Sequence, residues 1–188
     1  MQDGMIDRII RAIRLDPTLY REVADDESYL TEGIIIVAMV TFLSALGAGL
    51  GAAFNQTGRS FIGAFFWDAF TRVLLGWLLW AVISYFVGAL LGGKSSVAEM
   101  ARTLAYAQAP AFVAFLSFIP CIGFIFAIAS FLLSLAAGVI AIRESMEFDT
   151  MNAVITAVIG FLLYIVASII IGLLFGGVSA AIGLGGLR

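Results

Sequence analysis

Residues 101–143 read ARTLAYAQAPAFVAFLSFIPCIGFIFAIASFLLSLAAGVIAIR and hold no charged residue between Arg102 and Arg143. An apolar run of this length is about twice the ~20 residues that one helix needs to cross the hydrocarbon core of a bilayer. Pro120 and Gly123 stand near its middle and supply a turn. We therefore expect a helical hairpin, with both charged ends at the same face of the membrane.

Composition places the whole chain in the membrane class. Of the 188 residues, 62% are hydrophobic and 12% are charged, with a mean hydropathy of +1.09. Soluble domains are about half apolar and about a quarter charged, so the sequence predicts an integral membrane protein. Its expected fold class is all-α and polytopic, with a cytosolic segment over residues 1–32, a membrane domain over 33–182 and a short tail over 183–188.

Charge-free runs long enough to cross a bilayer predict five transmembrane helices. The expected spans are about 33–54, 70–92, 101–119, 122–142 and 151–175. Arg72 lies near enough to the end of the second span for its side chain to reach the membrane surface, and Asp68, one turn before it, is spaced to pair with it at i,i+4.

The N-terminal segment has the pattern of an amphipathic helix. Isoleucines at 6, 9, 10 and 13 fall on one helical face, while Arg8, Arg11 and Arg14 fall largely on the other. This arrangement favours a helix that lies on the membrane surface, and a helix that docks a partner is the alternative. Asp16 followed by Pro17 predicts the start of a short second helix.

Several classes of chemistry are excluded by residue types that the sequence lacks. It contains no histidine, and Cys121 is its only cysteine. A histidine-based triad, a zinc site and a CxxC redox pair therefore cannot be built, and we expect no enzyme activity, metal or cofactor. The net charge of −3 comes without a long basic run, which argues against a nucleic-acid partner.

Small residues spaced four apart predict close helix–helix packing. Three GxxxG pairs and one Ser/Gly pair have this spacing: Gly47 and Gly51, Gly88 and Gly92, Gly172 and Gly176, and Ser134 and Gly138.

The third predicted helix begins in water and bends inside the membrane. Ser96 and Glu99 have the spacing of a capping box, which marks a helix start. Pro110 removes the hydrogen bond to the carbonyl of Tyr106, so we expect a kink over residues 106–110. Gln108 lies at this kink and has two interpretations, an interhelical hydrogen bond or a polar ligand site.

Charged residues gather at the predicted cytosolic ends of the helices and form a tentative partner-binding surface: Lys94, Glu99, Arg102, Arg143 and Glu144. One hypothesis is that Arg102 and Arg143 dock the acidic segment 22–27, which would hold the N-terminal helices across the mouth of the bundle. The alternative is a solvated charged rim that obeys the positive-inside rule.

The pattern resembles a prokaryotic member of the Yip1 family. The residues that carry the resemblance are Gly92-Gly93-Lys94, Arg102-x-Leu104-Ala105-Tyr106-Ala107-x-Ala109-Pro110, Ile119-Pro120-x-x-Gly123 and Ile142-Arg143-Glu144. The resemblance implies a five-helix membrane domain with a cytosolic N-terminus. In eukaryotes the family is associated with Rab-type GTPases and traffic between the endoplasmic reticulum and the Golgi, a pathway that a prokaryotic chain does not have.

Two functions fit these features. The first is a non-enzymatic membrane adaptor or scaffold that associates with another membrane protein or forms a homo-oligomer in the lipid bilayer. The second is a small passive transporter or channel, built as an oligomer around Gln108 and Pro110. Coupled transport normally needs ionisable groups inside the membrane, and the predicted spans carry none away from their ends.

Lysine and arginine counts predict the orientation in the cell membrane. A cytoplasmic N-terminus places seven basic residues inside and three outside. With five spans, the C-terminus then lies outside. A reporter fused to the C-terminus should read as external; a cytoplasmic reading would contradict either the orientation or the number of spans.

Overall fold

The computed structural model describes residues 4–54 and 61–185, and every regular element in these ranges is a helix. The elements in chain order are α1 (Met5–Ile13), α2 (Pro17–Asp25), α3 (Tyr29–Phe54), α4 (Phe61–Thr71), the π-helix η1 (Arg72–Leu79), α5 (Trp80–Leu90), α6 (Val97–Tyr106), the 3-10 helix η2 (Ala109–Phe118), α7 (Gly123–Met146) and α8 (Thr150–Gly185). The predicted all-α membrane class is confirmed. Residues 186–188 of the predicted tail lie outside the described ranges.

Four helices in the described residues are long and apolar enough to cross a membrane. They are Tyr29–Gly51, Phe65–Leu90, Gly123–Met146 and Thr150–Ile171. The predicted third span, 101–119, is divided instead between α6 and η2. At about 1.5 Å per residue for α6 and about 2.0 Å for η2, these two ten-residue elements together cover roughly 35 Å.

Pro110 explains why this segment is broken. Proline has no N–H to donate to the carbonyl four residues earlier, and its ring crowds that carbonyl, so the α-helix cannot continue. The helix α6 accordingly ends at Tyr106, and the next bonds are short-range, with Gln108 donating to Ala105 and Ala111 donating to Gln108. The predicted kink is thus a change from α- to 3-10-helix.

A tight turn joins η2 to α7 where the sequence places Pro120 and Gly123. The amide of Gly123 donates to the carbonyl of Ile119 at 2.8 Å. A Cβ at Gly123 would lie 2.1 Å from the carbonyl oxygen of Ser117, so only glycine fits. The segment therefore folds back as an antiparallel hairpin, as the opening pattern predicted.

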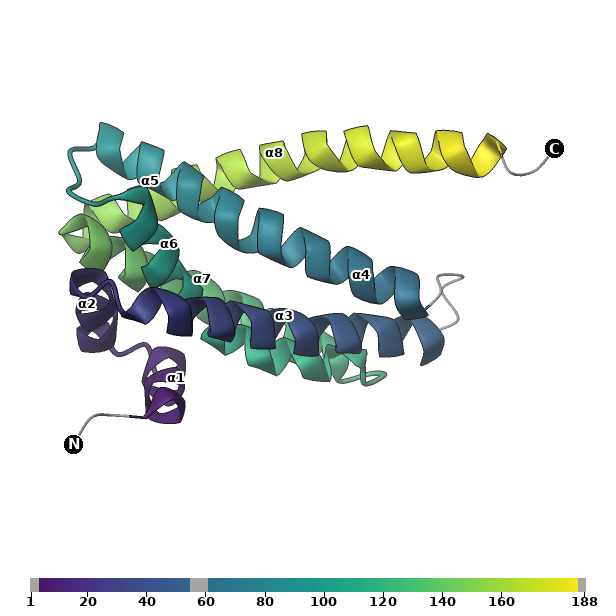
Figure 1. Cartoon of the computed structure of the whole chain (residues 1–188), viewed down its shortest axis with the longest axis horizontal. Helices are drawn as coiled ribbons and strands as arrows, with labels where there is room; N and C mark the ends of the chain where they lie inside the picture. Colours follow the sequence, from purple (N-terminus) through teal and green to yellow (C-terminus); the bar gives the residue numbers. More distant parts are fainter. Residues whose placement is uncertain (1–3, 55–60, 186–188) are drawn as a thin grey trace.

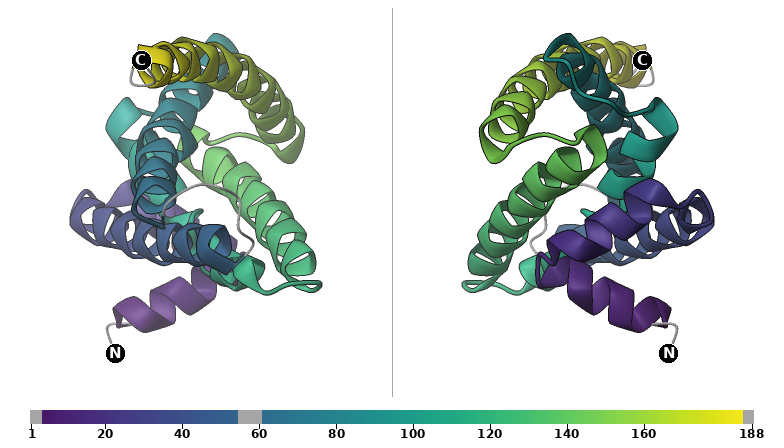
Figure 2. Two further views of the ribbon diagram at one scale, coloured as in Figure 1. Left: turned by 90° about the vertical axis from the view of Figure 1, so that its right-hand side faces the viewer. Right: turned by 90° about the vertical axis from the view of Figure 1, so that its left-hand side faces the viewer.

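The bundle has two distinct ends (Figure 1). The docked end carries α1, α2, the α5–α6 loop and the α7–α8 loop, and the hairpin end carries the turn between η2 and α7. Seen along the bundle, α1 lies on the side opposite to α8 (Figure 2). Helix α8 packs through one narrow face that buries Ala153, Thr156, Ala157 and Gly160.

Three of the predicted small residues lie at close helix contacts. A Cβ at Gly47 would lie 3.0 Å from the carbonyl oxygen of Phe115, one at Gly88 would lie 2.6 Å from Cε of Met146, and one at Gly138 would lie 2.2 Å from Cη2 of Trp80. These glycines let η2, α7 and α5 approach their neighbours.

The other members of these pairs differ. Gly92 is not a packing residue: it has φ +89° and caps α5, with the amide of Gly93 donating to the carbonyl of Gly88. Gly51 follows Gly47 by one turn on α3. Gly172 and Gly176 lie on α8, beyond the residues whose side chains the structure describes.

Gly138→Ala should lower stability because its methyl group collides with the Trp80 ring. We expect a loss of about 1–3 kcal/mol, the usual cost of overpacking, seen as a lower thermal unfolding midpoint in detergent. Gly76→Ala is the matched control, since its Cβ would lie 3.9 Å from the nearest atom. Equal midpoints for the two variants would contradict the close contact.

Candidate functional site

The docked end is built on an apolar face of α2. Leu19, Tyr20 and Val23 are completely buried, and they join a cluster that includes Met100 and Ile142. Asp16 starts α2 by accepting a hydrogen bond from the amide of Thr18 at 3.0 Å, as its position before proline predicts. Because α2 contributes to the core, the N-terminal segment is part of the folded bundle.

Arg102 holds the C-terminal end of α2 against the bundle. Its Nε donates to the carbonyl of Val23 and its Nη2 donates to the carbonyl of Ala24, both at 2.6 Å. These carbonyls belong to the last turn of α2, where helix geometry leaves acceptors without partners and the helix dipole is negative. Arg102 is only 4% exposed, so these carbonyls take the place of water around its guanidinium.

Two further arginines tie the N-terminal segment to the bundle. Arg21 donates to the carbonyl of Glu144 at 2.9 Å and to the carboxylate of Glu147 at 3.0 Å. Arg8 makes a two-point ion pair with Glu32 at the start of α3, with Nε 2.8 Å from Oε1. Arg–carboxylate pairs of this kind fix orientation as well as distance.

The two N-terminal helices are also tied to each other. Arg11 on α1 contacts Asp16 at 2.8 Å and Glu22 at 2.9 Å. The Arg11 guanidinium holds the pKa of Asp16 below its usual range. Tyr20 donates to the carbonyl of Ala12 at 3.1 Å, and burial raises the pKa of its phenol.

The charged residues predicted to bind a partner fall into different environments. Lys94 is exposed, and its backbone amide donates to Met146 at 3.1 Å. Arg143 bonds with the adjacent Glu144, and both are partly buried. Burial raises the pKa of Glu99, and Ser96 accepts from its amide at 3.1 Å.

The structure agrees with the docking hypothesis for Arg102 and differs from it for Arg143. Arg102 is an internal contact of α2 and is not available to a partner. Arg102 reaches segment 22–27 through backbone carbonyls and not through carboxylates, while Arg143 binds Glu144 instead of that segment.

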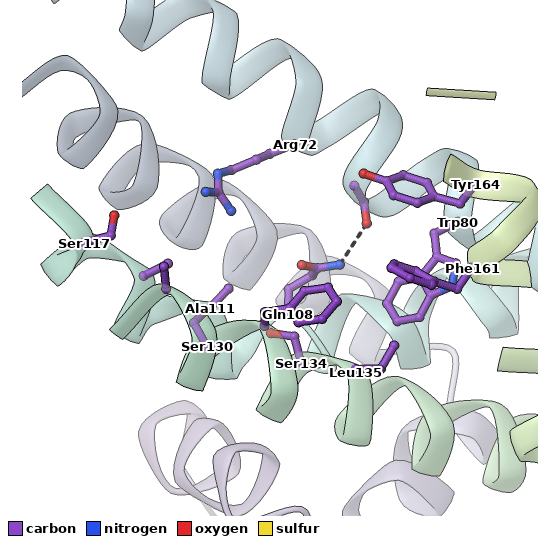
Figure 3. Close-up of a pocket in the computed structure, with 14 residues that line it drawn as sticks. Arg72, Trp80, Gln108, Ala111, Ser117, Ser130, Ser134, Leu135, Phe161 and Tyr164 are labelled. Atoms are coloured by element: carbon purple, nitrogen blue, oxygen red, sulfur yellow. Dashed lines mark hydrogen bonds between the residues drawn. The ribbon is translucent and has the colours of Figure 1, made fainter. Parts of the chain in front are cut away.

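A second candidate site is a cavity of about 330 Å³ between η1, η2, α7 and α8 (Figure 3). Gln108 lies on its wall and donates from Nε2 to the carbonyl of Gly76 at 3.1 Å. Gly76 is in the π-helix η1, a wider helix type that is often found at functional sites. The amide therefore makes an interhelical hydrogen bond and also borders an open space.

Tyr106 and Pro110, the other two residues of the predicted kink, are part of the buried core. Tyr106 is completely buried and packs edge-on against Tyr29, with ring centroids 6.2 Å apart. Pro110 is also fully buried. Neither is among the residues that line the cavity.

Some residues of both sites were not predicted from sequence. Arg21 and Glu147 were not assigned a joint role, because 126 positions separate them in the chain. Arg72 was expected only to pair with Asp68, which it does at 2.6 Å, but its side chain also lines the cavity. A π-helical segment has no sequence signal comparable to a proline or a cap.

Arg102→Met should release α2 from the bundle, because two buried carbonyls lose a charged donor worth about 1.5–3 kcal/mol each. We expect faster hydrogen exchange in residues 17–25 and faster proteolysis within 22–27. Arg102→Lys should be intermediate, since an ammonium does not reproduce the fork geometry of guanidinium.

Arg143→Met is the matched control, because this guanidinium contacts the neighbouring Glu144. It should leave the protection of α2 at the wild-type level. Unchanged protection in Arg102→Met would contradict the docking role of Arg102.

Comparison with known proteins assigns the chain to a family of membrane proteins. Searches of curated proteins and of solved structures gave no match. The model of the Yip1 domain matches residues 15–171, which include α2, all four long apolar helices and the broken α6–η2 segment. The match also covers the motifs on which the resemblance was based. The chain is therefore a multi-pass membrane protein that belongs to the Yip1 domain family.

Proposed function

We propose that this protein is a non-enzymatic membrane adaptor that binds a basic segment of another membrane protein at its docked end. The observation that supports the proposal is the docked N-terminal segment, which Arg102, Arg21 and Arg8 hold in one arrangement. A fixed surface costs little conformational entropy when a partner binds.

The exposed charges around this surface are mainly acidic. We call them the acidic rim: Glu22, Asp25, Asp26, Glu27, Glu147 and Asp149. Beside them lies a cleft of about 370 Å³ lined by residues that include Pro17, Thr18 and Glu144. Complementary charge favours a lysine- or arginine-rich partner segment and speeds its association.

The basic residues of the chain favour one orientation in the membrane. A cytoplasmic N-terminus places seven lysines and arginines inside and three outside. We infer a cytoplasmic docked end in the cell membrane, with the N-terminus inside and the C-terminus outside. The exposed residues Ile6, Ile10 and Arg14 of α1 suit the membrane surface at the same end.

The cavity at Gln108 favours a second candidate function, a small passive transporter or channel. It is polar on one wall and lies between membrane helices. The adaptor is preferred because Arg102, Arg21 and Arg8 hold the docked end in place as a surface, whereas the cavity has only a few polar groups on its wall.

The adaptor proposal predicts a charge-dependent partner. Asp26→Lys with Glu27→Lys reverses two exposed charges of the rim that form no ion pair with Arg21, and we expect a several-fold loss of a co-purifying membrane protein from mild detergent extracts. The same association should weaken as salt rises, since exposed charges are screened. Quantitative mass spectrometry of the purified complex measures both effects.

Asp7→Lys is the matched control, because it reverses an exposed acidic residue on α1 outside the rim. It should retain the partner. Wild-type recovery with the reversed rim would contradict the adaptor surface, and recovery of only this chain would indicate a homo-oligomer. Solute flux in liposomes that Gln108→Leu abolishes would instead support the transporter.

A further inference from the structure

The cavity beside η1 lies in the half of the bundle nearest the hairpin end. Ser130 and Ser134, on its wall, stand seven and eleven residues after the start of α7 at Gly123. At about 1.5 Å per residue they are roughly 10 and 16 Å from that end. The cavity therefore opens among helices at the depth of one lipid leaflet, far from the acidic rim.

Arg72 gives this cavity an unusual charge. It lies within the candidate span Phe65–Leu90, where an arginine is costly and is normally associated with a functional role. Its Nε is 2.6 Å from Oδ2 of Asp68, which lies one turn nearer the hairpin end. That bond uses one of the five N–H groups of a guanidinium, so the Nη atoms remain available as donors at the cavity wall.

Two further polar groups on the wall lack partners. Trp80 is 8% exposed, and its Nε1 has no hydrogen bond among the described residues; Oγ of Ser134 is likewise buried and unpaired there. The Nε2 of Gln108 already donates a hydrogen bond to the carbonyl of Gly76. Nε1 of Trp80 and Oγ of Ser134 have almost no accessible surface, so the N–H groups of Arg72 are the donors that a ligand with acceptor oxygens would use.

The rest of the cavity wall consists of small side chains and aromatic rings. The lining includes Ala114, Ala127 and Phe131. Ala111 and Phe161 also border the space (Figure 3). Ligand sites combine mostly apolar walls with a few placed polar groups, and about 330 Å³ is within their usual size. A ligand with one hydrocarbon chain and an acceptor head fits this division.

We propose that the cavity binds an amphiphile with an anionic oxygen head, a carboxylate or a phosphate, held at the Nη atoms of Arg72. The hydrocarbon chain lies along Phe131 and Phe161. Asp68 positions the guanidinium through Nε and does not contact the ligand. This site is separate from the acidic rim and does not depend on the adaptor function.

Native mass spectrometry of the delipidated full chain in a neutral detergent tests the site with three probes. Oleate carries a carboxylate, dioleoyl phosphatidylglycerol carries a phosphate, and glycerol monooleate carries no charge. We expect one or both anionic probes to bind at least about tenfold more tightly than glycerol monooleate, as a charge-assisted hydrogen bond allows. Preference for oleate or for phosphatidylglycerol identifies the source of the head group.

The variants Arg72→Gln and Asp68→Asn separate an anion site from a structural ion pair. Both variants break the ion pair, but an anion site predicts different effects on binding. Arg72→Gln should weaken anion binding about tenfold or more. Asp68→Asn should preserve or strengthen it, because it removes a negative charge near the anionic head of the ligand. Ala114→Phe should block all binding by filling the cavity, and Lys94→Gln, at the docked end, should leave it unchanged.

Equal binding of glycerol monooleate, no binding of any probe, or equal loss in Arg72→Gln and Asp68→Asn would overturn the proposal. If Ala114→Phe does not fold, as judged by its thermal unfolding, the comparison of Arg72→Gln with Asp68→Asn still decides it. Solute flux in liposomes tests the transporter, and charge reversal of the acidic rim tests the adaptor. The ligand-binding measurements test the cavity site alone, so each proposal can fail separately.

Discussion

The missing N–H of Pro110 determines much of this bundle. In hydrocarbon each backbone polar group needs a partner within the protein, so a crossing that contains proline is kinked or broken and its freed backbone groups need neighbours. Glycines of α3 allow this: a Cβ at Gly33 would lie 3.0 Å from Cβ of Ala105, and Gly47 faces Phe115 on η2. The broken segment packs between α3 and α7, and its polar side chain, Gln108, bonds to η1.

The same segment connects the two candidate sites. Arg102, near the start of α6, binds the last turn of α2, and Gln108, just after its end, binds the π-helix beside the cavity. Residues 103–107 between them are all buried. A buried, packed segment with a polar contact at each end has few alternative arrangements, so α2 and the cavity wall are positioned by one element.

Sequence patterns predicted the parts that local chemistry determines. The turn near Pro120, the start of α2 after Asp16 and the helix break at Pro110 each follow from a residue's own dihedral or hydrogen-bonding limits. The contact of Arg102 with α2 was partly predicted, but carbonyls were not distinguished from carboxylates as its acceptors. The pair of Arg21 with Glu147 and the cavity arise from tertiary packing, which the order of residues along the chain does not specify.

Charge separates the functions that the two sites can have. At the docked end Arg11 and Arg21 pair with Glu22, Asp25 and Glu147 of the rim. Asp26, Glu27 and Asp149 are exposed outside these pairs and favour a cationic partner. In the cavity, Arg72 uses only its Nε for Asp68 and presents its remaining N–H donors, which favours an anionic ligand. Opposite demands at opposite ends of one bundle mean that a single ligand cannot satisfy both. A partner in water and a lipid in the hairpin-end leaflet would therefore bind through different residues, even though the α6–η2 segment supports both surfaces.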